Sequence, residues 1–217
     1  MGSPFHHSLQ IEHDMKKIDY QKGMQPLYSA SSNAVAIINI PSLTYLLVDG
    51  TGDPNTTKEY VDAIEVLYAV SYTIKFMIKK GELNIDYRVL PLEGLWWVPK
   101  MEEFSTDHKE DWHWRMMIMQ PEIVTQRIFN DAMEAVRKKK HFTAMDALSY
   151  TSYNEGKCAQ LLHVGPYRDE KPTIDRLHEY IALQGFKRRG KHHEIYLNDP
   201  RKTLPEKLKT IIRQPIQ

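Results

Sequence analysis

One stretch, His192-His193-Glu194-Ile195-Tyr196-Leu197-Asn198-Asp199-Pro200, alternates like a β-strand and then ends in a turn. The Asn-Asp-Pro end favours a turn because proline cannot extend a ladder of backbone hydrogen bonds. With a period of two, Ile195 and Leu197 share the core face, while Glu194 and Tyr196 share the other face. If that second face is covered, Glu194 is a partly desolvated anion that needs a protein or ligand partner. If it is open, Glu194 is an ordinary surface carboxylate.

The composition favours a cytoplasmic globular protein. The 217 residues suit one large domain or two small fused ones, and 41% hydrophobic content is enough for a core. A net charge of +1 argues against direct nucleic-acid binding. The single cysteine, Cys158, excludes an internal disulfide and suits a reducing compartment. No apolar run approaches membrane length and no signal peptide is visible, so we expect no membrane contact.

The remaining elements follow from periodicity, caps and breakers. Residues 1–10 are not used to predict the fold, because the N-terminus of a chain often includes residual tag sequence. In chain order, we predict an arm over residues 1–33, apolar runs over 34–40 and 43–48, a helix from 56 or 57 to about 80, strands over 84–90, 91–99 and 112–119, a helix that opens at 120–122, a hairpin over 148–164 with its turn at 154–157, a helix from about 172 to 184, the strand around Glu194, and a final strand over 210–212.

The two halves of the chain repeat each other. The sequence of residues 46–50 matches that of 161–165, and residues 117–121 match 211–215. Between these matches each half runs helix, strand, strand. We therefore predict an α+β fold of tandem strand–helix–strand–strand modules, over about 34–120 and 145–217, related by a pseudo-two-fold axis. Their antiparallel sheets would enclose a central ligand groove, and by position Glu93 would lie where Glu194 lies.

Several motifs, in this order along the chain, resemble the GyrI-like small-molecule-binding domain. They are Asp49-Gly50-Thr51-Gly52-Asp53-Pro54-Asn55, Pro91-Leu92-Glu93-Gly94-Leu95-Trp96-Trp97, His163-Val164-Gly165-Pro166-Tyr167, the Glu194 strand, Pro205-Glu206 and Pro215-Ile216. The resemblance covers roughly residues 18–217 and is strongest to the stand-alone branch of the family. It implies tandem strand–helix–strand–strand modules that bind a planar, often cationic, aromatic ligand, with Glu194 as the acidic contact. Some members of that branch are hydrolases that open the cyclopropane ring of DNA-alkylating antibiotics within an aromatic cage, a detoxification that confers drug resistance.

The resemblance implies a set of site residues. Glu194 would orient or deprotonate the attacking water, and a phenol, either Tyr167 or Tyr196, would stabilise the oxygen on which negative charge develops. The predicted substrate-binding residues are Trp96, Trp97, Trp112, Trp114, Glu93, Tyr68 and His163. We predict no cofactor and no metal, because none of the 10 histidines has strong metal-ligand spacing.

Structural roles compete with these assignments. In a strand Trp96 and Trp97 point to opposite faces, so at most one of them lines a groove. Trp112 and Trp114 share a face and could equally be core residues, while Glu93 could be a satisfied polar residue. His163 is typical of a hydrogen-bonded sheet histidine. Three functions stay open at this point: a hydrolase, a protein that binds or sequesters planar aromatic drugs without turnover, and a module that interacts with gyrase. The oligomeric state does not follow from the sequence.

Overall fold

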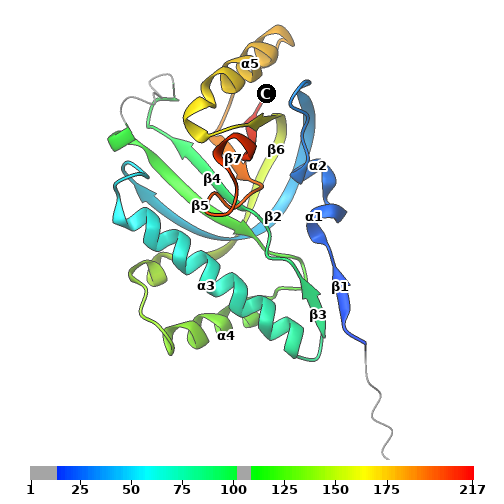
Figure 1. Cartoon of the computed structure of the whole chain (residues 1–217), viewed down its shortest axis with the longest axis vertical. Helices are drawn as coiled ribbons and strands as arrows, with labels where there is room; N and C mark the ends of the chain where they lie inside the picture. The colour runs from blue at the N-terminus through cyan, green and yellow to red at the C-terminus, as the bar shows by residue number, and fades with distance from the viewer. Residues whose placement is uncertain (1–13, 102–108) are drawn as a thin grey trace, which may run out of the picture.

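Six antiparallel strands close into a barrel in the order β2-β5-β4-β7-β8-β6 (Figure 1). The computed structural model describes residues 14–101 and 109–217. The strands are β1 (Lys16–Ile18), β2 (Ala36–Thr51), β3 (Ile85–Tyr87), β4 (Leu92–Trp97), β5 (His113–Met119), β6 (Ser149–Val164), β7 (His192–Tyr196) and β8 (Lys209–Pro215). The α-helices are α1 (Tyr20–Gly23), α2 (Gln25–Tyr28), α3 (Lys58–Lys80), α4 (Gln126–Arg137) and α5 (Lys171–Leu183).

The barrel has the predicted two-fold order. One half is β2-α3-β4-β5, apart from the short β3, and the other is β6-α5-β7-β8. The equivalent strands are β2 and β6, β4 and β7, and β5 and β8. When each is replaced by its equivalent, the strand order around the barrel is reversed and every pairing is kept. The two halves meet where β4 pairs with β7 and where β2 pairs with β6. The predicted α+β fold of tandem strand–helix–strand–strand units is therefore confirmed.

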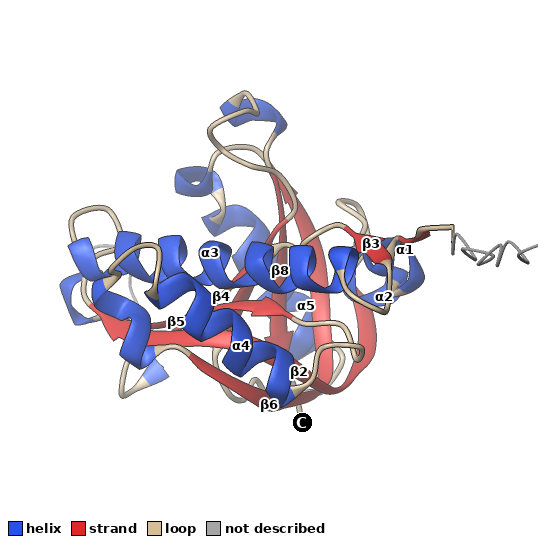
Figure 2. Cartoon of the chain, turned by 90° about the horizontal axis from the view of Figure 1, so that it is seen from below, coloured by secondary structure: helices blue, strands red, loops and turns tan. Residues whose placement is uncertain are grey.

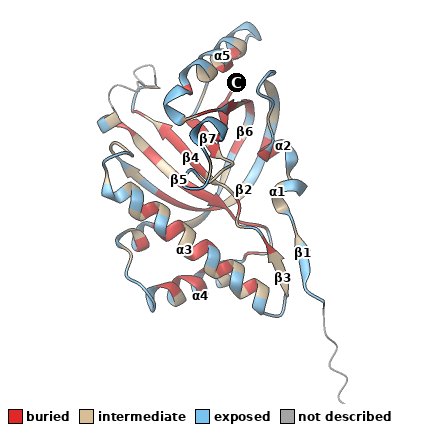
Figure 3. Cartoon of the chain, viewed as in Figure 1, coloured by how far each residue is buried: buried red, intermediate tan, exposed pale blue. Residues whose placement is uncertain are grey.

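Helices cover the outer face of the barrel on two sides (Figures 1 and 2). α3 and α4 pack on the half formed by β2, β4 and β5, where Leu67 and Ile74 of α3 meet Ile118 of β5 in one apolar cluster. α5 packs on the other half, where Leu177 and Ile181 join Ile212 of β8. The helix surfaces that face the barrel are buried and their outer surfaces are exposed (Figure 3). The seam between β4 and β7 thus lies between the α3 and α5 sides.

Two predicted interruptions are wrong, since β2 and β6 each run through 16 residues. Pro41 does not end β2, because β5 pairs only from Tyr45 onward and Pro41 therefore lies where β2 has one neighbour. The predicted hairpin over 148–164 is a single strand, β6. Gly156 adopts a positive φ of 71° within it, yet the residues on both sides of Gly156 pair with β2. Pairing with a long neighbour overrides the local turn signal.

Smaller differences concern helix ends and faces. α4 begins at Gln126, several residues later than predicted, with Thr125 as its N-cap accepting from the backbone N–H of Ile128. α3 ends at Lys80, as predicted, and Val61 on this helix is 53% exposed. Among residues 14–101 and 109–217, no helix is both long and apolar enough to cross a membrane.

The barrel interior contains an ionic network among apolar side chains. His193 lies between two carboxylates: its Nε2 is 3.0 Å from Glu93 Oε2, and its Nδ1 is 2.9 Å from Glu155 Oε1. Because carboxylates only accept hydrogen bonds, both imidazole nitrogens donate and His193 is cationic. Burial alone lowers the pKa of His193, but the charges of Glu155 and Glu93 and the bonds to them raise it above its usual value. Arg213 completes the network, with Nη1 3.5 Å from Glu155 Oε2.

The arm that precedes β2 closes one part of this interior. Tyr28 is buried and donates a hydrogen bond of 2.8 Å to Glu93 Oε1. Arg213 donates to the backbone carbonyl of Leu27, and Gln160 donates to those of Pro26 and Ser29. Residues 26–29 are therefore part of the folded body, although their sequence shows no sustained period.

Candidate functional site

Glu194 lies on the outer face of β7 and is held by two neighbours. Tyr196 donates a hydrogen bond of 2.7 Å to Oε2, and His192 Nε2 is 3.1 Å from Oε1. The Glu194 side chain is 15% exposed and that of His192 is 4% exposed. The carboxylate is therefore mostly desolvated but still accessible, which fits a group that meets a ligand rather than one in bulk water.

The strand register brings β4 against this face. Gly94 pairs with Glu194 and Trp96 pairs with His192, so these residues share the outer face. Trp96 donates from Nε1 to the Tyr196 hydroxyl at 3.2 Å. A Cβ atom on residue 94 would lie 2.9 Å from that indole nitrogen and 3.1 Å from the Tyr196 hydroxyl. Glycine at 94 thus lets the Trp96–Tyr196–Glu194 hydrogen-bond chain form.

Aromatic rings from three elements surround Trp96. Its ring centroid lies 5.4 Å from that of Trp112 and 5.9 Å from that of Tyr60, which belongs to α3. Tyr60 also meets Trp114 edge to face at 5.3 Å. Ring separations in this range are those of favourable aromatic pairs. Trp96, Trp112 and Trp114 are largely buried, so they serve both as core and as the wall beside Glu194.

Tyr167 contacts Tyr196, and Tyr68 of α3 acts on Tyr167. Tyr167 is 38% exposed, and its ring meets that of Tyr196 edge to face at 5.5 Å. Burial, followed by the charges of Glu170 and Glu194, raises the pKa of Tyr167 to about 12. Burial, with added contributions from Tyr72 and Asp199, also raises the pKa of Tyr68. Both phenols therefore keep their protons at neutral pH and can donate hydrogen bonds.

Two predicted site residues, Glu93 and Trp97, lie away from Glu194. The strand register explains the position of Glu93. Ile118 pairs with Leu92, while Ile212, which corresponds to Ile118 in the repeat, pairs with Glu194. Leu92 is therefore the counterpart of Glu194, and Glu93 points into the barrel.

Trp97 also faces away from Glu194, as the alternation with Trp96 requires. It stacks on His113 at 5.6 Å, and Lys191 Nζ lies 3.2 Å from the centroid of its ring.

His163 supports the loop before α5. It is buried on β6, with Nδ1 3.0 Å from Thr173 Oγ1 and Nε2 3.3 Å from the carbonyl oxygen of Pro166. The two ring nitrogens thus face groups on either side of Tyr167, one just before it and one in the first turn of α5. This geometry matches the hydrogen-bonded sheet histidine rather than a ligand contact.

Two residues of the site, Tyr60 and Glu170, were not among the predicted ones. Tyr60 and Tyr68 are about two helical turns apart and so share one face of α3, a spacing that could have indicated both. Glu170 is 5% exposed and its charge affects Tyr167 and Tyr196. Nothing in the local sequence around Glu170 indicates this, because β7 is distant in the chain.

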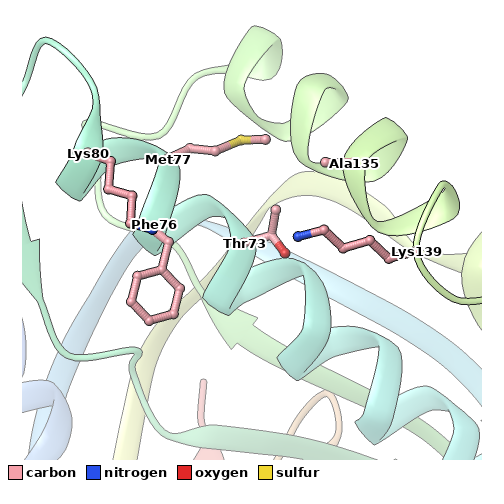
Figure 4. A pocket seen from close by; sticks show the side chains of 6 residues that line it. All are labelled: Thr73, Phe76, Met77, Lys80, Ala135 and Lys139. Atoms are coloured by element: carbon pink, nitrogen blue, oxygen red, sulfur yellow. The ribbon is translucent and has the colours of Figure 1, made fainter.

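Two hollows on the surface lie elsewhere. One, of about 390 Å³, is lined by Thr73, Phe76, Met77 and Lys80 of α3 and by Ala135 and Lys139 at α4 (Figure 4). The other, of about 430 Å³, lies between α5 and the segment before β7. Neither contains Glu194, so the candidate site is defined by its side chains. In the described parts of the chain, no group of three or more His, Cys, Asp or Glu residues is arranged to hold a metal ion.

A closed barrel of two equivalent halves, with a mostly buried carboxylate among aromatic rings, has the features of a small-molecule-binding domain. The sequence matches the family model of the GyrI-like small molecule binding domain over residues 33–217. The chain therefore belongs to the GyrI-like family, as its motifs predicted. A search of curated proteins found no match.

Three solved structures from Listeria innocua are similar over nearly the whole chain. An uncharacterized conserved protein is 38% identical, with a TM-score of 0.85, and the alignment covers 92% of this chain and 100% of that one. A hydrolase encoded by lin2189 is 38% identical with a TM-score of 0.82, over 93% of this chain and 100% of that one. Another hydrolase is 36% identical with a TM-score of 0.79, over 92% and 100%.

Proposed function

We propose that this protein binds planar aromatic molecules beside Glu194 and hydrolyses those that carry a strained cyclopropane ring, a detoxification that would take place in the cytoplasm. The main support for this proposal is the Glu194 carboxylate. It is 15% exposed, accepts a hydrogen bond of 2.7 Å from Tyr196 and lies next to the aromatic rings around Trp96. Two similar proteins described as hydrolases support an enzymatic role. Hydrolysis by this chain, and its substrate, are proposals that rest on the site chemistry and on the resemblance.

Recognition of the ligand would use aromatic faces and one negative charge. A flat ring system beside Trp96 and Tyr60 gains from burial and from offset stacking, on the order of 1 kcal/mol per aromatic pair beyond burial. A cationic ring gains further from the rings and from Glu194. The exposed Tyr167 ring, which covers Tyr196, is the part of the site that a ligand would meet first.

The proposed reaction adds one water molecule across a cyclopropane bond. Glu194 accepts a proton from water while the water oxygen forms a bond to the strained methylene carbon. The breaking carbon–carbon bond leaves its electron pair on the ring system, where it collects on the dienone oxygen as a phenolate. That oxygen then takes up a proton, so the product is a phenol bearing a hydroxymethyl group.

The structure favours Tyr167 over Tyr196 as the phenol that donates to the developing oxyanion. The hydroxyl proton of Tyr196 is already donated to Glu194, and its oxygen accepts from Trp96. The Tyr167 hydroxyl has no hydrogen-bond partner within residues 14–101 and 109–217, and its raised pKa of about 12 keeps it a donor.

The test is multiple-turnover hydrolysis of a spiro-cyclopropyl dienone, followed by mass spectrometry of a product one water heavier. Glu194→Gln should lower kcat roughly 10²–10⁴-fold, the usual contribution of a general base. Trp96→Ala should weaken binding, seen as reduced quenching of tryptophan fluorescence. Glu179→Gln, an exposed carboxylate on α5, is the matched control and should behave like wild type.

The outcomes separate the competing functions. A tight complex that returns unchanged compound would show binding or sequestration without turnover. Wild-type rates in both Glu194→Gln and Trp96→Ala would place the reaction elsewhere in the protein. Absence of binding by planar aromatic compounds would leave interaction with a protein such as gyrase as the surviving function.

A further inference from the structure

Glu170 is a buried carboxyl that has no ion-pair partner among the residues that the structure describes. It lies between the short 3-10 helix Tyr167–Asp169 and α5, and it is 5% exposed. Its Oε1 atom has no hydrogen-bond partner, and no ion pair within residues 14–101 and 109–217 includes Glu170. It caps no helix with its side chain, although it precedes α5. A buried ionised carboxylate without partners is costly, so this position needs another explanation.

The groups that act on Glu170 belong to the Glu194 site. The charge of Glu194, on β7, acts on Glu170, and Glu170 in turn acts on Tyr196 of β7 and on Tyr167. Thr210 of β8 is a neutral neighbour whose hydroxyl also acts on Glu170, although its Oγ1 makes no hydrogen bond of normal length. Tyr60 and Tyr68 of α3, and Asp199 after β7, act on the same cluster. The basic groups of this cluster are each paired with another acid: His192 lies 3.1 Å from Glu194, and Arg201 lies 2.9 Å from Asp199. No ion pair in the described part of the chain neutralises Glu170 itself.

The two carboxyls of this site lie in different surroundings. Burial, and next the Glu194 charge, raise the pKa of Glu170 to about 9, so it holds a proton at neutral pH. Glu194, in contrast, accepts a hydrogen bond from Tyr196 and lies 3.1 Å from His192 Nε2, so its oxygens have partners that Glu170 Oε1 lacks. A cation placed between the two carboxyls would stabilise the ionised form of Glu170.

We propose that Glu170 is the second acidic group of the ligand site, and that it releases its proton to solvent when an aromatic cation binds beside Glu194. Neutral aromatic ligands of the same shape would bind without proton release. The proposal rests on the proposed function in one respect, because it requires that planar aromatic ligands bind at this site. It goes further because it specifies that the positive charge of the ligand causes the proton release and that Glu170 is the residue that loses the proton.

The experiment compares two nearly identical probes, N-methylacridinium, a permanent cation, and acridine, which is neutral slightly above neutral pH. Titration calorimetry in two buffers with different ionisation enthalpies counts the protons released. We expect about one proton for N-methylacridinium and about none for acridine. Affinity for the cation should rise up to roughly tenfold per pH unit between about pH 6 and pH 8, because one proton leaves on binding.

Two variants assign the proton to Glu170. Glu170→Gln should bind both probes without proton release and with a flat pH profile. Asp169→Asn, which removes an exposed carboxyl one position away, should behave as wild type. If Glu170→Gln does not fold, the comparison of the two probes on wild-type protein still decides whether cation binding releases a proton.

Failure of this proposal can be told apart from failure of the proposed function. Wild-type protein that binds N-methylacridinium without releasing protons refutes the role of Glu170 and leaves the ligand site intact. Proton release that persists in Glu170→Gln assigns it to another group and also refutes the proposal. Wild-type protein that binds neither probe overturns both.

Discussion

Neighbouring residues on β7 belong to different chemical environments. His193 faces the barrel interior, where it lies between Glu93 and Glu155, while Glu194 faces the candidate site on the outer surface. The alternation of a strand predicted this separation, and it placed Glu194 beside Tyr196 correctly. The partners of His193 could not be predicted, because they come from other strands: Glu93 was assigned to the ligand site and Glu155 to a turn.

Tyr28→Phe tests how much the interior network contributes to stability. The substitution removes the hydroxyl that donates to Glu93 at 2.8 Å and leaves a buried carboxylate oxygen without that donor. We expect a loss of about 1–3 kcal/mol in the free energy of unfolding, measured by urea denaturation. Tyr72→Phe, at an exposed position on α3, is the control. Equal stability of the two variants would show that Tyr28 is not a significant partner of Glu93.

At the scale of elements, local signals predicted most helices and strands, and pairing between strands decided the rest. The turn predicted at Asn154-Glu155-Gly156-Lys157 failed because β6 pairs with β2 on both sides of Gly156. Glu93 was assigned to the ligand site by aligning short repeats, which cannot fix strand register. A slip of one residue moves a side chain to the opposite face, and the observed register sends Glu93 inward.

Gly94→Ala tests whether the packing of β4 against β7 shapes the ligand site. The added Cβ would lie 2.9 Å from Trp96 Nε1 and 3.1 Å from the Tyr196 hydroxyl, so these groups must shift. We expect weaker quenching by planar aromatic compounds and a destabilisation of roughly 1–3 kcal/mol, typical of overpacking. Gly23→Ala, where a Cβ would meet nothing within 4 Å, should keep full binding. Unchanged ligand affinity in Gly94→Ala would exclude the Trp96–Tyr196 pair from the site.

The whole molecule is a closed barrel whose two halves meet at the candidate site. Its two-fold order was predictable from the repeat, since the same sequence of elements occurs twice. The role of the arm was not, because Tyr28 and the carbonyl of Leu27 act through single contacts with the barrel and leave no periodic pattern. Burial of charged groups inside the barrel and at the seam also links the stability of the molecule to pH.

Stability should decrease as pH rises from about 6.5 to about 9. His193 has a raised pKa in the folded state, so its contribution is present below the unfolded value of 6.5 and is lost as pH rises through the folded pKa. Glu170, with a folded pKa of about 9, keeps a proton that the unfolded chain has already released. Each group lowers stability by at most about 1.4 kcal/mol per pH unit over its window.

Urea denaturation between these pH values measures the effect. The free energy of unfolding should decrease less steeply with pH in Glu170→Gln. The difference from wild type should equal the contribution of one titrating group. On the acidic side, the lowered pKa of Glu155 gives a loss of stability as pH falls through it. A wild-type stability that is constant or rises across the alkaline window would contradict the assigned protonation states of His193 and Glu170.

The alternation along β7 also restricts how this strand can change length during evolution. Removing or adding one residue would turn Glu194 inward to join Glu93 and Glu155, placing three acids in a dry interior, and would leave the imidazole of His193 among the rings outside. Substitutions can adjust either compartment separately, but a single-residue insertion or deletion disrupts both at once. Length variation is therefore expected in the loops that flank β7 and not within it.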